Sequence, residues 1–119
     1  GNLITEPWEL RLEALGFQKD KETMWLLEGL TGYLTEPELK TLLAKISTLA
    51  TETSRMTATF VGASMKENAT SMHRYLVSGP EQIESLMSGF GWTAAVNHLG
   101  AVAEKYKRTQ IPKDYGYFL

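Results

Sequence analysis

The sequence contains no cysteine, which excludes a disulfide framework, a thiolate metal site and a cysteine nucleophile. It also lacks an excess of charge of either sign. Its 12 basic and 14 acidic residues give a net charge of −2, which argues against a nucleic-acid binder with a basic face. No apolar run approaches the ~20 residues of a membrane span, and the first residues given do not show a basic stretch followed by an apolar one. We therefore expect a soluble, cytoplasmic protein that binds neither nucleic acid nor membrane.

The chain does contain enough apolar sequence for one hydrophobic core. Its 119 residues are 43% hydrophobic, and a chain of about this length buries roughly two-thirds of the surface that its unfolded state exposes. No internal repeat, low-complexity tract or linker divides the sequence. We expect a single domain over residues 1–119.

The spacing of apolar residues predicts five helices. The clearest begins at the capping box Thr35-Glu36-Pro37-Glu38 and continues with apolar residues at helical spacing to Ala50. The other four are expected over residues 6–15, with Thr5 as the cap, and over 65–76, 80–90 and 99–106.

Shorter apolar or alternating segments predict four strands, over residues 24–27, 55–61, 92–96 and 115–119. The first is a continuous apolar run, so we expect it to be buried. Strands that alternate with helices in this way predict an α/β fold with a mostly parallel sheet. Ligands of such sheets bind beyond the carboxyl ends of the strands. The loops after Leu27 and Val61 are therefore where we expect the chemistry.

Glu28, Gly29 and Tyr33 are the candidate site residues in the first of these loops. The Glu28 carboxylate directly follows a strand and can accept hydrogen bonds from a ligand hydroxyl, amine or ring nitrogen. Gly29 beside it allows a ligand to approach the backbone closely. Glu28 can equally be a solvated loop acid, whereas an aromatic residue in front of a capped helix, such as Tyr33, is more commonly a packing residue.

The remaining candidates predict no further site. His73 and His98 lie ~25 residues apart without an acidic partner at metal-ligand spacing, so we expect no metal site and place His73 at the surface near a helix end. Gly89-Phe90-Gly91 follows a helix and precedes a strand, whereas a dinucleotide-binding turn needs the opposite order.

Several segments, taken in order, resemble the carboxyl-terminal half of the leucine carboxyl methyltransferase family. The most specific is the run Glu28-Gly29-Leu30-Thr31-Gly32-Tyr33-Leu34, which resembles the family pattern "EGLl.YL". Further segments that resemble the family are Leu15-Gly16-Phe17, Thr23 to Leu27, Leu42 to Arg55, Arg74-Tyr75, Pro80 and Gly91-Trp92.

The resemblance implies a class I, Rossmann-like fold with helices on both faces of a mostly parallel sheet and a final antiparallel strand. It also implies S-adenosylmethionine as the cofactor, with Glu28 and Gly29 facing the cofactor pocket and Tyr33 on the substrate side as the catalytic candidate. Asn2 and Leu3 match the Asp-Leu pair that holds the adenine end, with Asn2 in place of the acid. Thr59 stands where many members carry an acidic residue.

The glycine-rich cofactor loop of the family has no counterpart in these 119 residues. We therefore expect a fragment of an O-methyltransferase that acts on a carboxylate or hydroxyl of a small molecule, with little activity alone. In the family fold the Met24–Leu27 strand would pair with the first strand, which is not among these residues, so we expect it to be an open edge. Open strand edges favour association. We therefore expect a homodimer or larger species that forms through that edge. The alternative is a non-catalytic α/β interaction module derived from the same fold.

Overall fold

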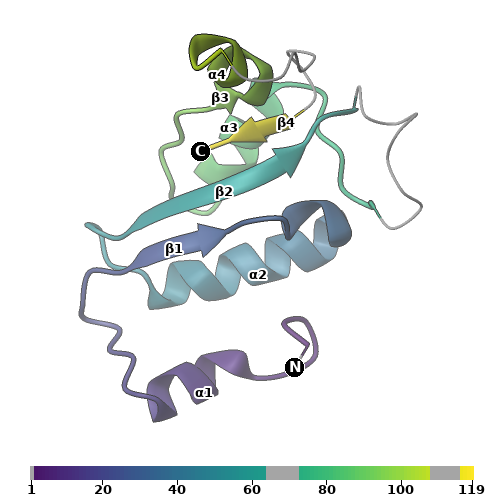
Figure 1. Cartoon of the computed structure of the whole chain (residues 1–119). Helices are drawn as coiled ribbons and strands as arrows, with labels where there is room; N and C mark the ends of the chain where they lie inside the picture. Colours follow the sequence, from purple (N-terminus) through teal and green to yellow (C-terminus); the bar gives the residue numbers. More distant parts are fainter. Residues whose placement is uncertain (1, 64–72, 108–115) are drawn as a thin grey trace.

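The computed structural model describes residues 2–63, 73–107 and 116–119. Helices and strands alternate along most of this chain (Figure 1). In chain order the elements are α1 (Trp8–Ala14), β1 (Met24–Leu27), the 3-10 turn η1 (Thr31–Tyr33), α2 (Glu36–Leu49), β2 (Arg55–Val61), α3 (Pro80–Ser88), β3 (Asn97–His98), α4 (Leu99–Lys105) and β4 (Gly116–Phe118).

The four strands form one mixed sheet in the order β1-β2-β4-β3. β1 pairs with β2 in parallel, whereas β4 runs antiparallel to both β2 and β3. The last strand therefore inserts between two strands that share one direction. The expectation of an α/β fold is confirmed, but only one of the three pairings is parallel, so the sheet is mixed rather than mostly parallel.

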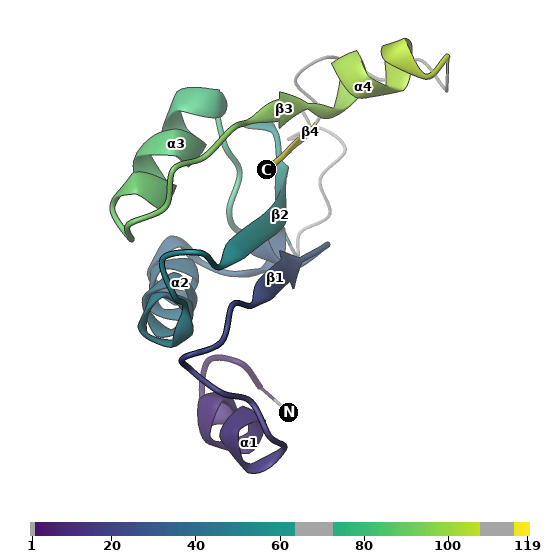
Figure 2. The ribbon, with the colours of Figure 1, turned by 90° about the vertical axis from the view of Figure 1, so that its left-hand side faces the viewer.

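The two longest helices cover the same face of the sheet. Figure 2 shows α2 and α3 on one side, whereas α4 lies beyond β3 on the other side. The outer face of β1 carries Met24 and Leu26, whose exposed fractions are 61% and 64%. The expected buried strand is thus buried on one face only, because the described helices pack against its Leu27 side.

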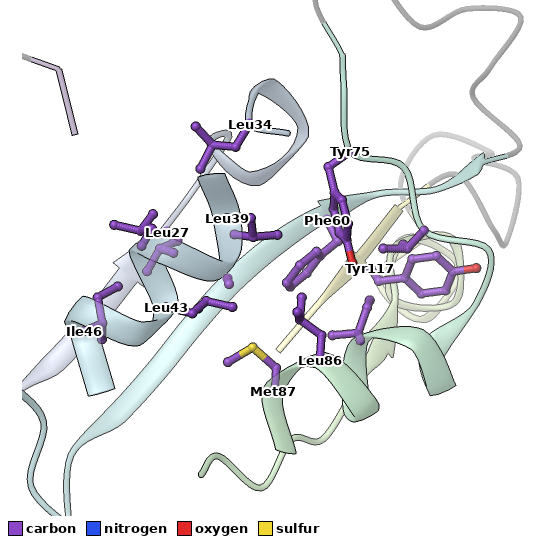
Figure 3. Close-up of a cluster of buried hydrophobic side chains, with 14 residues drawn as sticks. Leu27, Leu34, Leu39, Leu43, Ile46, Phe60, Tyr75, Leu86, Met87 and Tyr117 are labelled. Carbon is purple, nitrogen blue, oxygen red and sulfur yellow. The ribbon is translucent and has the colours of Figure 1, made fainter. Parts of the chain in front are cut away.

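The hydrophobic core lies between the sheet and these two helices. Leu39 and Leu43 of α2 and Met87 of α3 converge on Phe60 of β2, and all four side chains are almost fully buried (Figure 3). Tyr117 of β4 extends the same cluster. Burying a side chain of this size contributes about 1.5–3 kcal/mol, so this face holds the elements of the sheet in place.

The start of α2 is fixed by the predicted capping box. The Glu38 backbone N–H donates to Thr35 Oγ1 at 3.4 Å, and the Thr35 N–H donates to Glu38 Oε2 at 2.7 Å. These two bonds satisfy donors that a helix end otherwise leaves free. The turn before α2, which carries Tyr33, therefore has a defined end.

Helix α1 is shorter than expected and is capped differently. It begins at Trp8 after Pro7, and no side-chain hydrogen bond caps it, so the prediction of Thr5 as the cap is wrong. The backbone N–H of Thr5 instead donates to Asn2 Oδ1 at 3.4 Å, within a turn that precedes the helix. The ion pair between Glu9 and Lys45, at 3.3 Å, ties α1 to α2.

The strand predicted over residues 92–96 is wrong, because the structure places β3 directly after this segment, at Asn97–His98. Trp92 Nε1 donates to Ser47 Oγ of α2 at 3.3 Å, which holds the segment next to the helix instead of the sheet. In the described sheet β3 lies next to β4, which has three residues and pairs with β3 over two of them.

The predicted helix over 65–76 and the predicted strand over 115–119 fall partly outside the described residues. Met65, Ala69 and Met72 lie outside them, and Leu76 is not helical. The next residue, Val77, donates its N–H to the Val61 carbonyl at 2.9 Å, so this segment extends along the end of β2. Tyr115 also lies outside the described residues, and the strand itself is Gly116–Phe118.

Acid is expected to weaken the start of α2. Hydrogen bonds from the backbone and the side chain of Thr35 hold the pKa of Glu38 below its ordinary value of 4.5. A lowered carboxyl pKa adds stability above the unfolded-state value, and this stability is lost as the pH falls through the folded-state value. We expect the Tm of the wild type to fall more than that of Glu38→Gln between pH 6 and pH 3. Thermal unfolding at several pH values measures this, and equal slopes would contradict it.

Candidate functional site

The carboxyl ends of β1 and β2 meet at one edge of the sheet, and two hydrogen bonds to Thr59 fix the loop that follows β1. The Gly29 N–H donates to Thr59 Oγ1 at 2.9 Å, and Thr31 Oγ1 donates to the Thr59 carbonyl at 2.7 Å. Thr31 is only 1% exposed. Thr59 therefore determines where residues 28–33 lie, a role that its position on a strand does not reveal.

Glu28 and Gly29 are open to solvent at this edge. Gly29 has φ +61°, a conformation that favours glycine, and a Cβ added there would meet no atom within 4 Å. Glu28 is exposed at the rim of a groove of about 370 Å³ on the outer face of the sheet. The groove is lined mainly by Leu26, Glu28, Thr57, Thr59, Leu99 and Phe118. A ligand can therefore reach both the carboxylate and the adjacent backbone.

Tyr33 lies in η1, and its ring packs against His73. The ring centroids are 4.9 Å apart at an interplanar angle of 39°, and Tyr33 is 43% exposed. The helix expected to end near His73 does not extend over residues 73–76, none of which is helical, and the rest of that predicted helix lies outside the described residues. The only sequence signal for this contact was the aromatic character of both rings, which does not identify a partner 40 residues away.

Backbone hydrogen bonds hold His73 against η1. The N–H groups of Arg74 and Tyr75 both donate to the Gly32 carbonyl, at 2.6 and 3.3 Å. A Cβ added at Gly32 would lie 2.9 Å from Val61 Cγ2 and 3.2 Å from His73 Cδ2. Glycine at this position is therefore what allows the two segments to approach each other closely.

Asn2 and Leu3, the other two candidates, make local contacts. Asn2 Oδ1 accepts from the Ile4 N–H at 2.9 Å, and the Leu3 carbonyl accepts from Trp8 Nε1 at 3.0 Å. These bonds shape the turn before α1. The structure therefore brings Glu28, Gly29 and Tyr33 together with Thr59 and His73 at one edge, whereas the contacts of Asn2 and Leu3 belong to the N-terminal turn.

A second hollow, of about 400 Å³, lies near the amino end of β2. Both of its serine hydroxyl groups have partners: Ser54 Oγ accepts from the N–H groups of Thr23 and Thr51, and Ser47 Oγ donates to the Phe90 carbonyl. Since these two hydroxyl groups are hydrogen-bonded within the chain, this hollow has fewer free polar groups for a ligand than the edge beyond β1, where the Glu28 carboxylate is exposed.

The described residues also bear on metal binding and on membrane insertion. They contain no group of three or more His, Asp or Glu side chains arranged to hold a metal ion. None of their helices is long and apolar enough to cross a membrane.

Comparison with known proteins supports the resemblance that the sequence suggested. The sequence model of the leucine carboxyl methyltransferase family matches residues 2–47. The family resemblance is confirmed. The matched segment contains Asn2, Leu3, Glu28, Gly29 and Tyr33, the five candidates that the resemblance implied. His73, which the structure places against Tyr33, lies outside it.

Curated relatives extend the similarity over most of the chain. A Streptomyces avermitilis protein named "putative S-adenosyl-L-methionine-dependent methyltransferase" is 31% identical over 114 residues, which cover 88% of this chain and 40% of that protein. Relatives with the same description from Streptomyces coelicolor and Frankia alni are each 30% identical over 114 residues, with 88% of this chain covered and 40% and 39% of theirs. The chain thus spans about 40% of the length of these relatives.

Substituting Gly32 is expected to disturb the contact between Tyr33 and His73. Gly32→Ala would add a methyl group between Val61 and His73, and overpacking of this kind costs about 1–3 kcal/mol. We expect a lower denaturation midpoint and shifted His73 ring signals in NMR spectra. The control, Gly29→Ala, strains a positive φ but meets no neighbour, so it should leave those ring signals in place. Unchanged His73 signals in Gly32→Ala would contradict the predicted close packing.

Proposed function

We propose that these residues form part of an S-adenosylmethionine-dependent O-methyltransferase and contribute to both its cofactor pocket, through Glu28 and Gly29, and its acceptor side, through Tyr33. Three observations support the proposal: the match to the leucine carboxyl methyltransferase family, the names of the curated relatives, and Glu28 and Gly29 standing open at the carboxyl end of β1. We also propose that the mixed sheet corresponds to the carboxyl-terminal half of a Rossmann-like domain.

The open edge at Glu28 is the observation on which the proposal depends. The exposed carboxylate can accept hydrogen bonds from the hydroxyl or amine groups of the cofactor. The space beside Gly29 lets a ligand lie against the backbone, although the Gly29 N–H is already bonded to Thr59. Asn2 and Leu3 are proposed, by the family resemblance alone, to lie toward the adenine.

When bound, the cofactor supplies a sulfonium methyl group, which is already a strong electrophile. The protein then mainly has to align the acceptor oxygen with that methyl group. A carboxylate acceptor needs no base, whereas a hydroxyl acceptor needs a group that takes its proton. Tyr33, half exposed beside this edge, is the residue proposed to orient the acceptor.

The proposal concerns methyl transfer by a protein of the relatives' length, of which this chain spans about 40%. The glycine-rich cofactor loop of the family is not among the 119 residues. Backbone N–H groups of such loops hold anionic and polar parts of a cofactor. We therefore propose that the 119 residues bind the cofactor weakly and transfer little methyl by themselves.

Calorimetric titration of the chain with S-adenosylhomocysteine tests the proposed cofactor side. We expect a Kd of about 100 μM, which corresponds to roughly −5.5 kcal/mol. Glu28→Ala should weaken binding about tenfold, the loss expected for one hydrogen bond to a charged group. Glu22→Ala, which removes an exposed acid in front of β1, is the matched control and should bind like the wild type. Absence of heat in the wild type would contradict the proposal for this chain.

We also propose the alternative of a homodimer that forms through β1. In the described sheet β1 is an edge strand, because its one strand neighbour is β2. Its outward side chains Met24 and Leu26 are mostly exposed. An open strand edge with apolar neighbours is a template for pairing with a second copy of the same strand. A dimer of this kind fits the alternative function, a non-catalytic interaction module, and is also compatible with an enzyme.

Analytical ultracentrifugation across a range of concentrations tests this association. The wild type should sediment as a dimer or larger species, and Leu26→Lys should shift it to the monomer by placing a charge at the edge. Leu10→Lys, on α1, changes a leucine of similar exposure, 61% against 64%, and should leave the oligomeric state unchanged. A wild type that stays monomeric at the highest concentration would exclude the dimer.

A further inference from the structure

The cleft between α2 and α3 is a cavity to which the proposed methyl transfer assigns no ligand. Its volume of about 420 Å³ lies within the range of about 300–1,000 Å³ that small-molecule sites have. The cleft lies on the side of the sheet that these two helices cover, whereas the groove at Glu28 lies on the outer face (Figure 2). It is lined mainly by Glu36, Lys40, Tyr75, Gln82, Leu86 and Phe90.

The α2 side of the cleft carries one charge of each sign. Lys40 Nζ lies 2.7 Å from Glu36 Oε1, and both side chains are about half exposed. The hydrogen bond to Glu36 and the charge of Glu36 raise the pKa of Lys40 above its ordinary value of 10.5, so Lys40 is a cation at neutral pH. These two are the only charged side chains among the described residues that line the cleft. A ligand that also has one charge of each sign can pair with both of them.

Tyr75, in the segment before α3, adds a hydrogen-bond donor with a fixed position. Gln82 Nε2 donates to the Tyr75 hydroxyl oxygen at 3.3 Å, and Gln82 Oε1 in turn accepts from the Ser78 N–H at 2.9 Å. The phenol oxygen accepts in this bond, so its own hydrogen is left to donate, and it has no acceptor among the described residues. Since Tyr75 is only 6% exposed, a ligand in the cleft can supply that acceptor.

Leu86 of α3 and Phe90 after it form the apolar part of the cleft. Leu86 belongs to the hydrophobic core, and the half-buried Phe90 packs against that core. An apolar group of a ligand that lies on these side chains leaves water without burying a polar atom. A ring placed there can also make an edge or offset contact with the Phe90 ring. The cleft therefore combines an apolar surface with a pair of opposite charges and a phenol donor.

We propose that the cleft between α2 and α3 binds a free amino acid with an apolar side chain. The carboxylate of the amino acid accepts from the Lys40 ammonium and the Tyr75 hydroxyl, and its ammonium donates to the Glu36 carboxylate. Its side chain lies on Leu86 and Phe90. This second ligand site goes beyond the proposed methyl transfer, and binding there does not require the cofactor.

Phenylalanine, 3-phenylpropionate and 2-phenylethylamine test the proposal, because they share a phenyl side chain, and the second lacks the ammonium and the third the carboxylate. Titrations followed in ¹H–¹⁵N NMR spectra at pH 7 should shift the backbone amide signals of Ser85 and Gly89, which also line the cleft. We expect a Kd of about 1 mM for phenylalanine. Each analogue should bind about fivefold more weakly, the loss expected for one exposed ion pair.

Two variants remove one ligand contact each. Lys40→Gln should weaken phenylalanine binding about fivefold and leave 2-phenylethylamine binding unchanged, because only the carboxylate loses its partner. Tyr75→Phe keeps the ring and should weaken phenylalanine and 3-phenylpropionate alike. The matched control is Lys45→Gln, which changes another lysine of α2 whose ion pair is with Glu9, and it should bind all three probes like the wild type.

Equal binding of the three probes by the wild type would overturn the proposal. Phenylalanine that leaves the Ser85 and Gly89 signals in place, or that binds Lys40→Gln as tightly as the wild type, would overturn it as well. The titrations are run without S-adenosylhomocysteine, so absence of binding of that compound counts against the cofactor side alone. The wild-type comparison of the three probes remains decisive if Tyr75→Phe does not fold.

Discussion

The pairing of β1 with β2, completed by Thr59, is the constraint on which the candidate site depends. Parallel pairing brings the carboxyl ends of the two strands together, and Thr59 then binds the loop after β1 through its hydroxyl and its carbonyl. Without those bonds the loop that carries Glu28 and Tyr33 would have no fixed position relative to β2. The family segment from Glu28 to Leu34 is thus held by a residue outside that segment.

The two faces of the sheet differ, and this difference connects the fold to the proposals. Helices α2 and α3 bury one face around Phe60, so that face supplies most of the apolar burial (Figures 2 and 3). The other face of β1 and β2 presents exposed Leu26 and Glu28 and half-buried threonines along a groove. A ligand at Glu28 and a second strand at the edge of β1 would both use this less covered side of the molecule.

The close approach of two backbone segments at Gly32 brings the rings of Tyr33 and His73 into contact. Gly32 allows the two segments to approach because it has no side chain, and its carbonyl accepts both N–H groups of the following segment. In the described part of the chain the buried imidazole nitrogen Nδ1 of His73 has no hydrogen-bond partner.

The sequence by itself determined the elements whose signals are local. The capping box at Thr35 fixes where α2 begins, the alternation from Arg55 to Val61 gives β2 with its observed bounds, and the family motif identifies Glu28 to Leu34. Only the tertiary structure decided the mixed pairing of the sheet, the exposed face of Met24–Leu27, the displacement of β3 and the contact of His73 with Tyr33. Each of these depends on contacts between residues far apart in the chain, such as Trp92 with Ser47, and neither residue type nor spacing along the sequence encodes those contacts.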